Sequence, residues 1–280
     1  MKRNSSYGWS GAIFVLCAWL GASRSLAATD GQITVDEIVS RANRMAYYQG
    51  RDGSAKVLMT ITDSQNRTRT REFTILRRDD PAPDGRDDDS YCGNQKFYVY
   101  FTRPADVNKM VFMVHKKVDQ DDERYLYLPA LDLVKRIAAT EKRTSFVGSD
   151  FLYEDVSGRN INADVHELIE TSQNYYVLKN TPKDPASVEF SYFKMWIHKS
   201  TFIPIKSEYY DKSGEKYREY TAEKVETIDG YQTVTKARMS DLKAKSSTVI
   251  EYSNVKYNIG LPDDIFTERY LRKPPREFLK

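Results

Sequence analysis

The feature that most constrains this 280-residue chain is a long succession of short apolar runs, separated by turn residues, between Gly53 and Tyr257. The runs are rich in Val, Ile, Thr, Tyr and Phe, a composition typical of β-strands. Their turns are too closely spaced for crossover helices, so the pattern predicts an antiparallel meander. We expect strands at 57–61, 68–76, 96–102, 109–116, 124–128, 131–138, 175–180, 187–199, 203–211, 216–227, 231–242 and 248–257.

One helix is predicted before the first strand. Thr34 and Glu37 have the spacing of a capping box, and Ile33 and Ile38 occupy the two positions of a hydrophobic staple. Apolar side chains then recur at helical spacing as far as about Tyr48. The apolar face of this helix either simply packs on the core or plugs an open sheet.

The strand at 96–102 departs from simple alternation. Phe97, Val99 and Phe101 point to one face, and Tyr98 and Tyr100 point to the other. A sheet with one solvent-exposed face would carry polar residues at alternate positions, so this part of the sheet must be covered on both sides. Helices, or helices together with bound lipid, would supply the cover.

The N-terminus has the pattern of an export signal. Lys2 and Arg3 precede an apolar stretch at 12–22, and small residues up to Ala27 form a cleavage site. The alternative is a retained membrane anchor, but the stretch is shorter than the roughly 20 residues that span a bilayer. We therefore predict a signal peptide at 1–27, a periplasmic location and a single domain at 28–280.

The cysteine and charge content reduces the number of possible functions. Cys17 lies in the leader without the small preceding residue of a lipidation site, so Cys92 is the only mature cysteine and no internal disulfide can form. Cys92 is interpreted as a loop thiol. The leader also holds Lys2, Arg3 and Arg24, and without them the basic and acidic residues balance. This balance argues against nucleic-acid binding.

Catalytic signatures are absent from the sequence. It contains no P-loop, dinucleotide fingerprint, nucleophile elbow or CxxC pair. Ser145, Ser149 and Asp150 with a distant histidine would form a triad only if the fold assembled them, and such residues are more often caps. We expect no enzyme activity and no cofactor.

No metal site is expected either. His166 lacks the second histidine that a zinc-protease helix requires. Consecutive carboxylates at 87–89, within an acidic surface loop at 77–94, point in different directions and lack EF-hand spacing. The acidic run at 119–123 is interpreted in the same way, as solvated surface.

Four segments carry a family resemblance: RPADV at 103–107, YLYLPALDLVKRIAATEKRTSFVGSDFLYEDV at 125–156, TFIPIKSEYYD at 201–211 and LPDDIFTERYL at 261–271. In this order the chain resembles the LolA-like family of periplasmic outer-membrane lipoprotein-sorting proteins. The resemblance implies a mainly β (α+β) fold, in which one curved antiparallel sheet forms a half-open barrel closed by helices around an apolar cavity. Gln232 and Val234 depart from the family pattern, as does the long acidic loop.

Strand parity within these segments predicts the residues that line the cavity. Phe146, Phe151 and Tyr153 flank a turn at Gly148 and are expected at its mouth. Each candidate has core packing as its alternative, because a one-residue error in register reverses a strand. The predicted lipid-binding residues are Val57, Met59, Ile61, Phe73, Phe97, Val99, Phe101, Met110, Phe112, Leu126, Leu128, Ile137, Phe146, Phe151, Tyr153, Met195 and Ile197.

The resemblance implies a monomeric carrier of lipoprotein acyl chains or a related lipid, transferred between membrane-associated donor and acceptor proteins. The alternative is a periplasmic accessory or sensor subunit on the same scaffold, working with an RND-type transporter. Arg136 and Arg143 would contact a headgroup or a partner, or else remain exposed and solvated.

Overall fold

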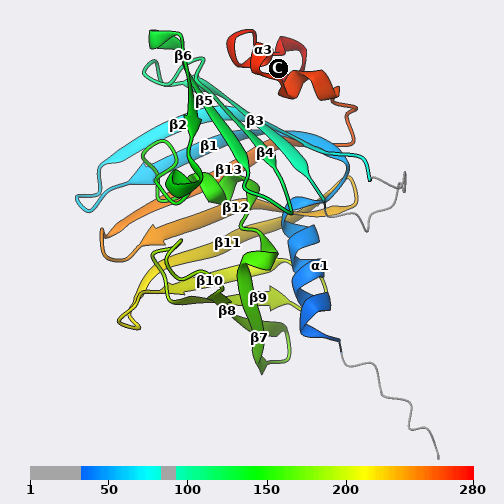
Figure 1. Ribbon diagram of the computed structural model, residues 1–280, viewed down its shortest axis with the longest axis vertical. Coiled ribbons are helices and arrows are strands. Elements are labelled where there is room, and N and C mark those ends of the chain that lie inside the picture. The colour runs from blue at the N-terminus through cyan, green and yellow to red at the C-terminus, as the bar shows by residue number, and fades with distance from the viewer. Residues whose placement is uncertain (1–32, 83–92) are drawn as a thin grey trace, which may run out of the picture. The chain divides into compact units, whose positions relative to one another are not determined.

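One antiparallel sheet of thirteen strands organises the residues that the structure, a computed structural model, describes, namely 33–82 and 93–280 (Figure 1). The predicted signal peptide, the carboxylates at 87–89 and Cys92 lie outside these residues. The strands are β1 (Asp52–Thr62), β2 (Thr68–Asp79), β3 (Gln95–Arg103), β4 (Val111–Lys116), β5 (Glu123–Leu128), β6 (Leu133–Ile137), β7 (Asp164–Thr171), β8 (Tyr175–Pro182), β9 (Tyr192–His198), β10 (Pro204–Tyr210), β11 (Lys216–Ile228), β12 (Tyr231–Asp241) and β13 (Ser246–Tyr257).

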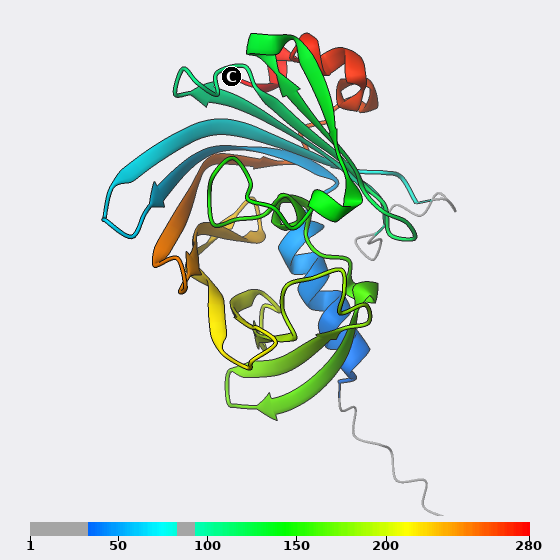
Figure 2. The ribbon, with the colours of Figure 1, turned by 60° about the vertical axis from the view of Figure 1, so that its left-hand side comes forward.

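The sheet consists of two meanders joined side by side. Strands β1 to β6 pair in chain order, β7 to β13 do the same, and β13 pairs with β1. Register shifts interrupt five of the pairings in or beside the second meander, and such bulges bend a sheet and increase its twist. The sheet therefore curves strongly while its edges, β6 and β7, stay apart (Figure 2). This confirms the predicted fold class of a half-open barrel.

Helix α1 (Val35–Tyr47) lies inside the curve of the sheet (Figure 2). It begins as predicted, because the Thr34 hydroxyl accepts a hydrogen bond from the Glu37 amide at 3.2 Å. Its apolar face, centred on the fully buried Ile38, packs against Leu178 of β8 and Ile197 of β9. The helix therefore packs on a buried cluster on the concave side of an open sheet.

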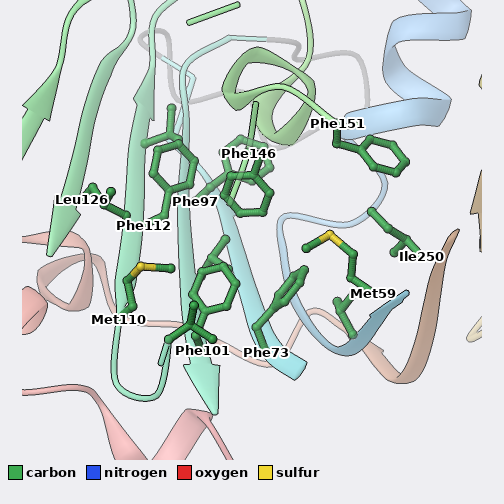
Figure 3. Close-up of a cluster of buried hydrophobic side chains, with 14 of the residues drawn as sticks. Met59, Phe73, Phe97, Phe101, Met110, Phe112, Leu126, Phe146, Phe151 and Ile250 are labelled. Carbon is green, nitrogen blue, oxygen red and sulfur yellow. The ribbon is translucent and has the colours of Figure 1, made fainter. Parts of the chain in front are cut away.

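The crossover segment, residues 138–163, is the second element on the concave side. It connects the two edge strands, and it contains η2 (Ala139–Glu141), α2 (Tyr153–Ser157) and η3 (Ile161–Ala163). Its Phe146 ring lies 5.9 Å from that of Phe101 and 5.4 Å from that of Phe112, measured between centroids (Figure 3). The crossover thus covers the first meander, while α1 covers the second.

The C-terminal segment covers the opposite, convex face. It comprises η4 (Asp263–Phe266), α3 (Glu268–Arg272) and η5 (Arg276–Phe278). Its Phe266 is buried in a cluster with Tyr98 and Met113 of the first meander, and the Tyr98 hydroxyl donates to the Tyr270 carbonyl at 2.7 Å. The predicted two-sided cover of the strand at 96–102 is therefore confirmed, and protein supplies it on this face. No helix among the described residues combines the length and apolarity needed to cross a bilayer.

The structure corrects several element boundaries. Strand β7 was not predicted, because its polar sequence DVHELIET lies on an edge and exposes every second side chain or more. Strand β2 continues to Asp79, so Arg77 and Arg78 belong to the sheet and not to the acidic loop. Strand β9 begins only at Tyr192, and a 3₁₀ turn, η1 (Pro129–Leu131), occupies the predicted start of β6.

A buried ion network fixes the crossover segment. The Glu154 side chain is 5 % exposed and forms ion pairs with Arg143 at 2.8 Å and with Arg159 at 3.5 Å. Arg159 also forms an ion pair with Asp164 of β7 at 2.8 Å. Both guanidinium groups lie over the Phe190 ring. Arg143 is therefore not a solvated arginine, since its side chain is only 9 % exposed. Burial alone would raise the pKa of Glu154, but the two arginine charges lower it.

We predict that Glu154→Gln destabilises the protein by about 3 kcal/mol, because it leaves buried arginines without their shared carboxylate. Urea unfolding followed by circular dichroism measures this change. The control is Glu251→Gln, which removes an exposed pair with Lys236 at 3.1 Å and should change the free energy of unfolding by less than about 0.5 kcal/mol. Equal effects of the two substitutions would contradict the role assigned to Glu154.

Candidate functional site

A cavity of about 380 Å³ lies on the concave side of the sheet, where α1, the crossover segment and both meanders meet. Of the residues predicted to line a cavity, six do so. The six are Phe73, Phe97, Val99, Phe146, Phe151 and Met195.

The other predicted residues lie on the same concave side but pack against protein. Ile197 contacts α1, and the rest form one cluster around Phe146, which is 3 % exposed and lies inside the cluster instead of at a mouth (Figure 3). The residues packed in this way are Val57, Met59, Ile61, Phe101, Met110, Phe112, Leu126, Leu128, Ile137, Tyr153 and Ile197. Whether they contact lipid stays a prediction.

The second meander and α1 supply lining residues that the sequence analysis did not select. From the meander come Ala237, Met239 and Ile250, and from α1 comes Met45. The strands of the second meander were predicted, and the alternation of Ala237 with Met239 would have assigned the inward face. The contribution of α1 carried no such signal, because it depends on where the helix ends against the sheet. Val234, one of the departures from the family pattern, also lines the cavity.

A polar anchor holds the C-terminal end of α1 at the cavity wall. The guanidinium group of Arg77 donates to the carbonyls of Tyr47, Gln49 and Gly50 at 2.7, 2.8 and 2.6 Å. The Tyr47 carbonyl also accepts from the Gln95 side chain at 2.8 Å, so two side chains satisfy carbonyls that the end of the helix leaves without backbone partners. Arg77 also pairs with Asp79 at 3.0 Å. Burial raises the pKa of Asp79 to about 6, although the positive charge of Arg77 opposes the shift.

This raised pKa predicts a pH dependence of stability. The folded carboxyl titrates at about 6 and the unfolded one near 3.8, so the folded state binds the proton more tightly. The contribution of Asp79 is therefore fully present below about pH 4 and is lost as the pH rises through 6. We expect the stability of the wild type relative to Asp79→Asn to fall by about 2 kcal/mol between pH 4.5 and 7.5. Urea unfolding of both proteins at the two pH values measures this, and a constant difference would contradict it.

The cavity also contains polar groups. Five tyrosines line it together with Asp155 of α2, namely Tyr47, Tyr209, Tyr220, Tyr252 and Tyr257. Burial raises the pKa of Tyr252 to about 12 and raises those of the other four phenols as well. The phenols are therefore neutral hydrogen-bonding groups at physiological pH.

The serines considered for a triad have structural partners. The Ser145 hydroxyl donates to the Ser149 carbonyl, and the Ser149 hydroxyl donates to the Phe146 carbonyl, both at 2.7 Å. Asp150 accepts from the hydroxyl of Thr248 in β13 at 2.6 Å. These bonds shape the Gly148 turn and attach it to the sheet, and no histidine joins them. The structure thus places the three side chains in a turn that closes the concave side.

The histidines and the remaining carboxylates also lie apart from the cavity lining. The His115 ring contacts the Phe266 carbonyl at 2.7 Å, and His166 contacts the Asn180 side chain at 2.7 Å. Asp122, in the acidic run at 119–123, pairs with Arg124 at 2.6 Å. Across the described ranges, no three His, Cys, Asp or Glu side chains converge as metal ligands.

Solved structures place this arrangement in a known fold class. A DUF1329 family protein from Desulfovibrio piger is 29 % identical, with a TM-score of 0.74 over 86 % of this chain and 100 % of that one. A domain from Vibrio parahaemolyticus, assigned to outer membrane lipoprotein sorting, is 25 % identical, with a TM-score of 0.72 over 84 % and 97 %. The LolA superfamily protein NE2245 from Nitrosomonas europaea, at 22 % identity and a TM-score of 0.63 over 85 % and 100 %, shows the same fold. The protein is a LolA-like half-barrel.

Sequence comparison agrees with this assignment. A family model with the description "Uncharacterized protein" matches residues 93–273, well over half of the chain. The chain belongs to this family. No functionally curated protein matches it in sequence.

Proposed function

We propose that this protein is a periplasmic carrier, which binds the acyl chains of lipoproteins or a related lipid and transfers them towards the outer membrane. The observation that supports the proposal best is the cavity of about 380 Å³ beneath α1, a size within the usual range of ligand sites, roughly 300–1,000 Å³. The assignment of the Vibrio parahaemolyticus domain to lipoprotein sorting points in the same direction.

The energetics of transfer explain the design of the cavity. Each methylene group left in water costs about 0.8 kcal/mol, so exposure of a whole palmitoyl chain costs on the order of 12 kcal/mol. A carrier must offset most of this free energy while the chain is in transit. The lining of Phe97, Val99, Met195 and Met239 can do so without fixed geometry, because methionine side chains adapt to ligands of different shape. A cargo with several chains would have to displace part of the cluster around Phe146.

The proposed carrier acts in the periplasm, between the inner and outer membranes. The N-terminal pattern of Lys2, Arg3 and the apolar stretch at 12–22 supports export, with cleavage after Ala27. The carrier would act as a monomer, receiving cargo from one membrane-associated protein and delivering it to another.

The β5–β6 turn favours a second candidate function. Leu131 is 70 % exposed and Leu133 is 47 % exposed, and exposed apolar side chains grouped in this way are typical of contact sites. An accessory or sensor subunit that contacts an RND-type transporter would use such a surface and would not need to hold lipid.

Lipid extraction distinguishes the two functions. The protein, purified from the periplasm without detergent, is extracted with chloroform and methanol, and the extract is analysed by mass spectrometry. A carrier yields acyl lipid in a fixed ratio to protein. An extract free of lipid, together with no binding of added acyl lipid, would contradict the carrier proposal and favour the accessory subunit.

A cavity-filling variant locates the bound lipid. Ala237 lies buried at the cavity wall, so Ala237→Trp should lower lipid affinity by about tenfold, which corresponds to about 1.4 kcal/mol. The matched control, Leu58→Trp, places the same ring at an exposed position of the sheet and should leave binding unchanged. Lipid recovered per mole of protein is the measurement, and equal recovery from both variants would show that the lipid binds elsewhere.

A further inference from the structure

Four of the five tyrosines that line the cavity differ from the buried Tyr98 in the bonding of their hydroxyls. Buried phenols usually find a partner, as Tyr98 does at the Tyr270 carbonyl, 2.7 Å away. By contrast, the hydroxyls of these four tyrosines make no hydrogen bond within the described part of the chain, whereas that of the fifth, Tyr257, is bonded to the Thr233 hydroxyl at 2.7 Å. The four tyrosines, hereafter the phenol group, are Tyr47 of α1, Tyr209 of β10, Tyr220 of β11 and Tyr252 of β13.

The ion pair of Asp155 with Arg218 lies beside the phenol group and has unused hydrogen-bonding positions. Asp155 lines the cavity, and its Oδ2 accepts from the Leu152 amide at 2.7 Å and from Arg218. No described residue donates to its Oδ1. Arg218 is only 4 % exposed, and its guanidinium group lies over the Tyr209 ring at 5.1 Å. Its Nη2 donates to the Asp150 carbonyl at 3.2 Å, whereas its Nη1 is buried without a partner.

Unused polar groups in an apolar cavity require an explanation. The four residues are half-buried, and their hydroxyls are accessible from the cavity, since none is among the fully buried polar atoms without a partner. Phenylalanine would fill the same space, whereas a hydrocarbon chain that entered the cavity would remove water from each hydroxyl at a cost on the order of 1–3 kcal/mol. Four different elements each bring such a hydroxyl to one cavity. A cavity that held only hydrocarbon would gain nothing from them, whereas a ligand with oxygen atoms would satisfy them.

The charges indicate which oxygen-bearing group fits. Arg218, beside the phenol group, is already paired with Asp155, and Arg77 of the lining is paired with Asp79. The remaining cation of the lining, Lys256, is solvent-exposed, so its charge is screened by water and the phenol group has no buried, unpaired cation beside it. The charge of Asp155 also contributes to the raised pKa values of Tyr47, Tyr209 and Tyr220, which shows that it acts on this part of the cavity. A carboxylate buried here would meet Asp155 without a counter-ion of its own, whereas a neutral acceptor would not.

We propose that the phenol group recognises a neutral oxygen-bearing group next to the hydrocarbon chain, and that the natural ligand is an ester-linked lipid and not a free fatty acid. This inference rests on the proposed carrier function and adds the chemical class of the ligand. The ester carbonyl accepts hydrogen bonds from the phenols, and the lining of Phe97 and Val99 holds the chain.

Three probes with chains of matched length test the proposal: dodecane, methyl dodecanoate and dodecanoate. Their affinities at neutral pH are measured by displacement of N-phenyl-1-naphthylamine from the full mature protein. The wild type should bind methyl dodecanoate about threefold to tenfold more tightly than dodecane, the gain expected of one or two hydrogen bonds. It should also bind methyl dodecanoate more tightly than dodecanoate.

The variant Tyr220→Phe/Tyr252→Phe removes two hydroxyls and keeps both rings. It should bind methyl dodecanoate no more than about twofold better than dodecane, while its affinity for dodecane stays at the wild-type level and shows that the cavity is intact. Should the double variant lose dodecane binding through misfolding, the single variant Tyr252→Phe replaces it. The control Tyr192→Phe alters a ring that stacks on Tyr210, apart from the cavity lining, and should keep the full preference.

Three results would overturn the inference while leaving the carrier function in place. The first is equal wild-type affinity for methyl dodecanoate and dodecane, and the second is tighter binding of dodecanoate than of the ester. The third is a preference for the ester that survives in the double variant. Failure of all three probes to displace the dye from the wild type would overturn the carrier proposal, and this inference with it.

Discussion

The need to cover both faces of one apolar sheet governs this structure. In the first meander, Phe97 and Phe101 face the concave side while Tyr98 and Met113 face the convex side, and all four are buried. Burial of such side chains contributes on the order of 25 cal/mol per Å² of apolar surface, so the cover is a condition of folding. The convex cover is one continuous C-terminal segment. The concave cover consists of two separate pieces, α1 and the crossover segment, and the cavity lies where they meet.

Buried polar networks fix those two pieces at opposite sides of the cavity. Arg77 and Asp79 hold the end of α1, and Glu154 with Arg143 holds the crossover. Networks of this kind lose several kcal/mol when one partner is removed, so they specify position as well as stability. The wall of the cavity is therefore anchored by charge, while its lining is adaptable and largely apolar. That combination suits a carrier, which must keep its cavity open without binding its cargo too tightly to release it.

Local patterns predicted much of the fold, and the failures have local causes. The capping residues of α1 and the strands of both meanders carry their own signals, and the two-sided apolar pattern at 96–102 correctly required two covers. Strand β7 was missed because an edge strand exposes polar residues that do not alternate clearly. Most of the candidate site was also beyond prediction. Strand parity assigned Phe101 and Phe112 to the concave side, but parity cannot tell whether a cavity or Phe146 lies opposite them.

The sequence by itself determined the class of fold, the helix start and the face to which each strand residue points, because these depend on the periodicity of neighbouring side chains. Only the tertiary structure decided where the interior is solid and where it is hollow, since that depends on how Phe146 and α1 fill the space between distant strands. It also decided that Tyr47, Tyr209, Tyr220 and Tyr252 meet around one cavity. No local pattern encodes that meeting, because the four residues lie on four different elements brought together by the curvature of the sheet.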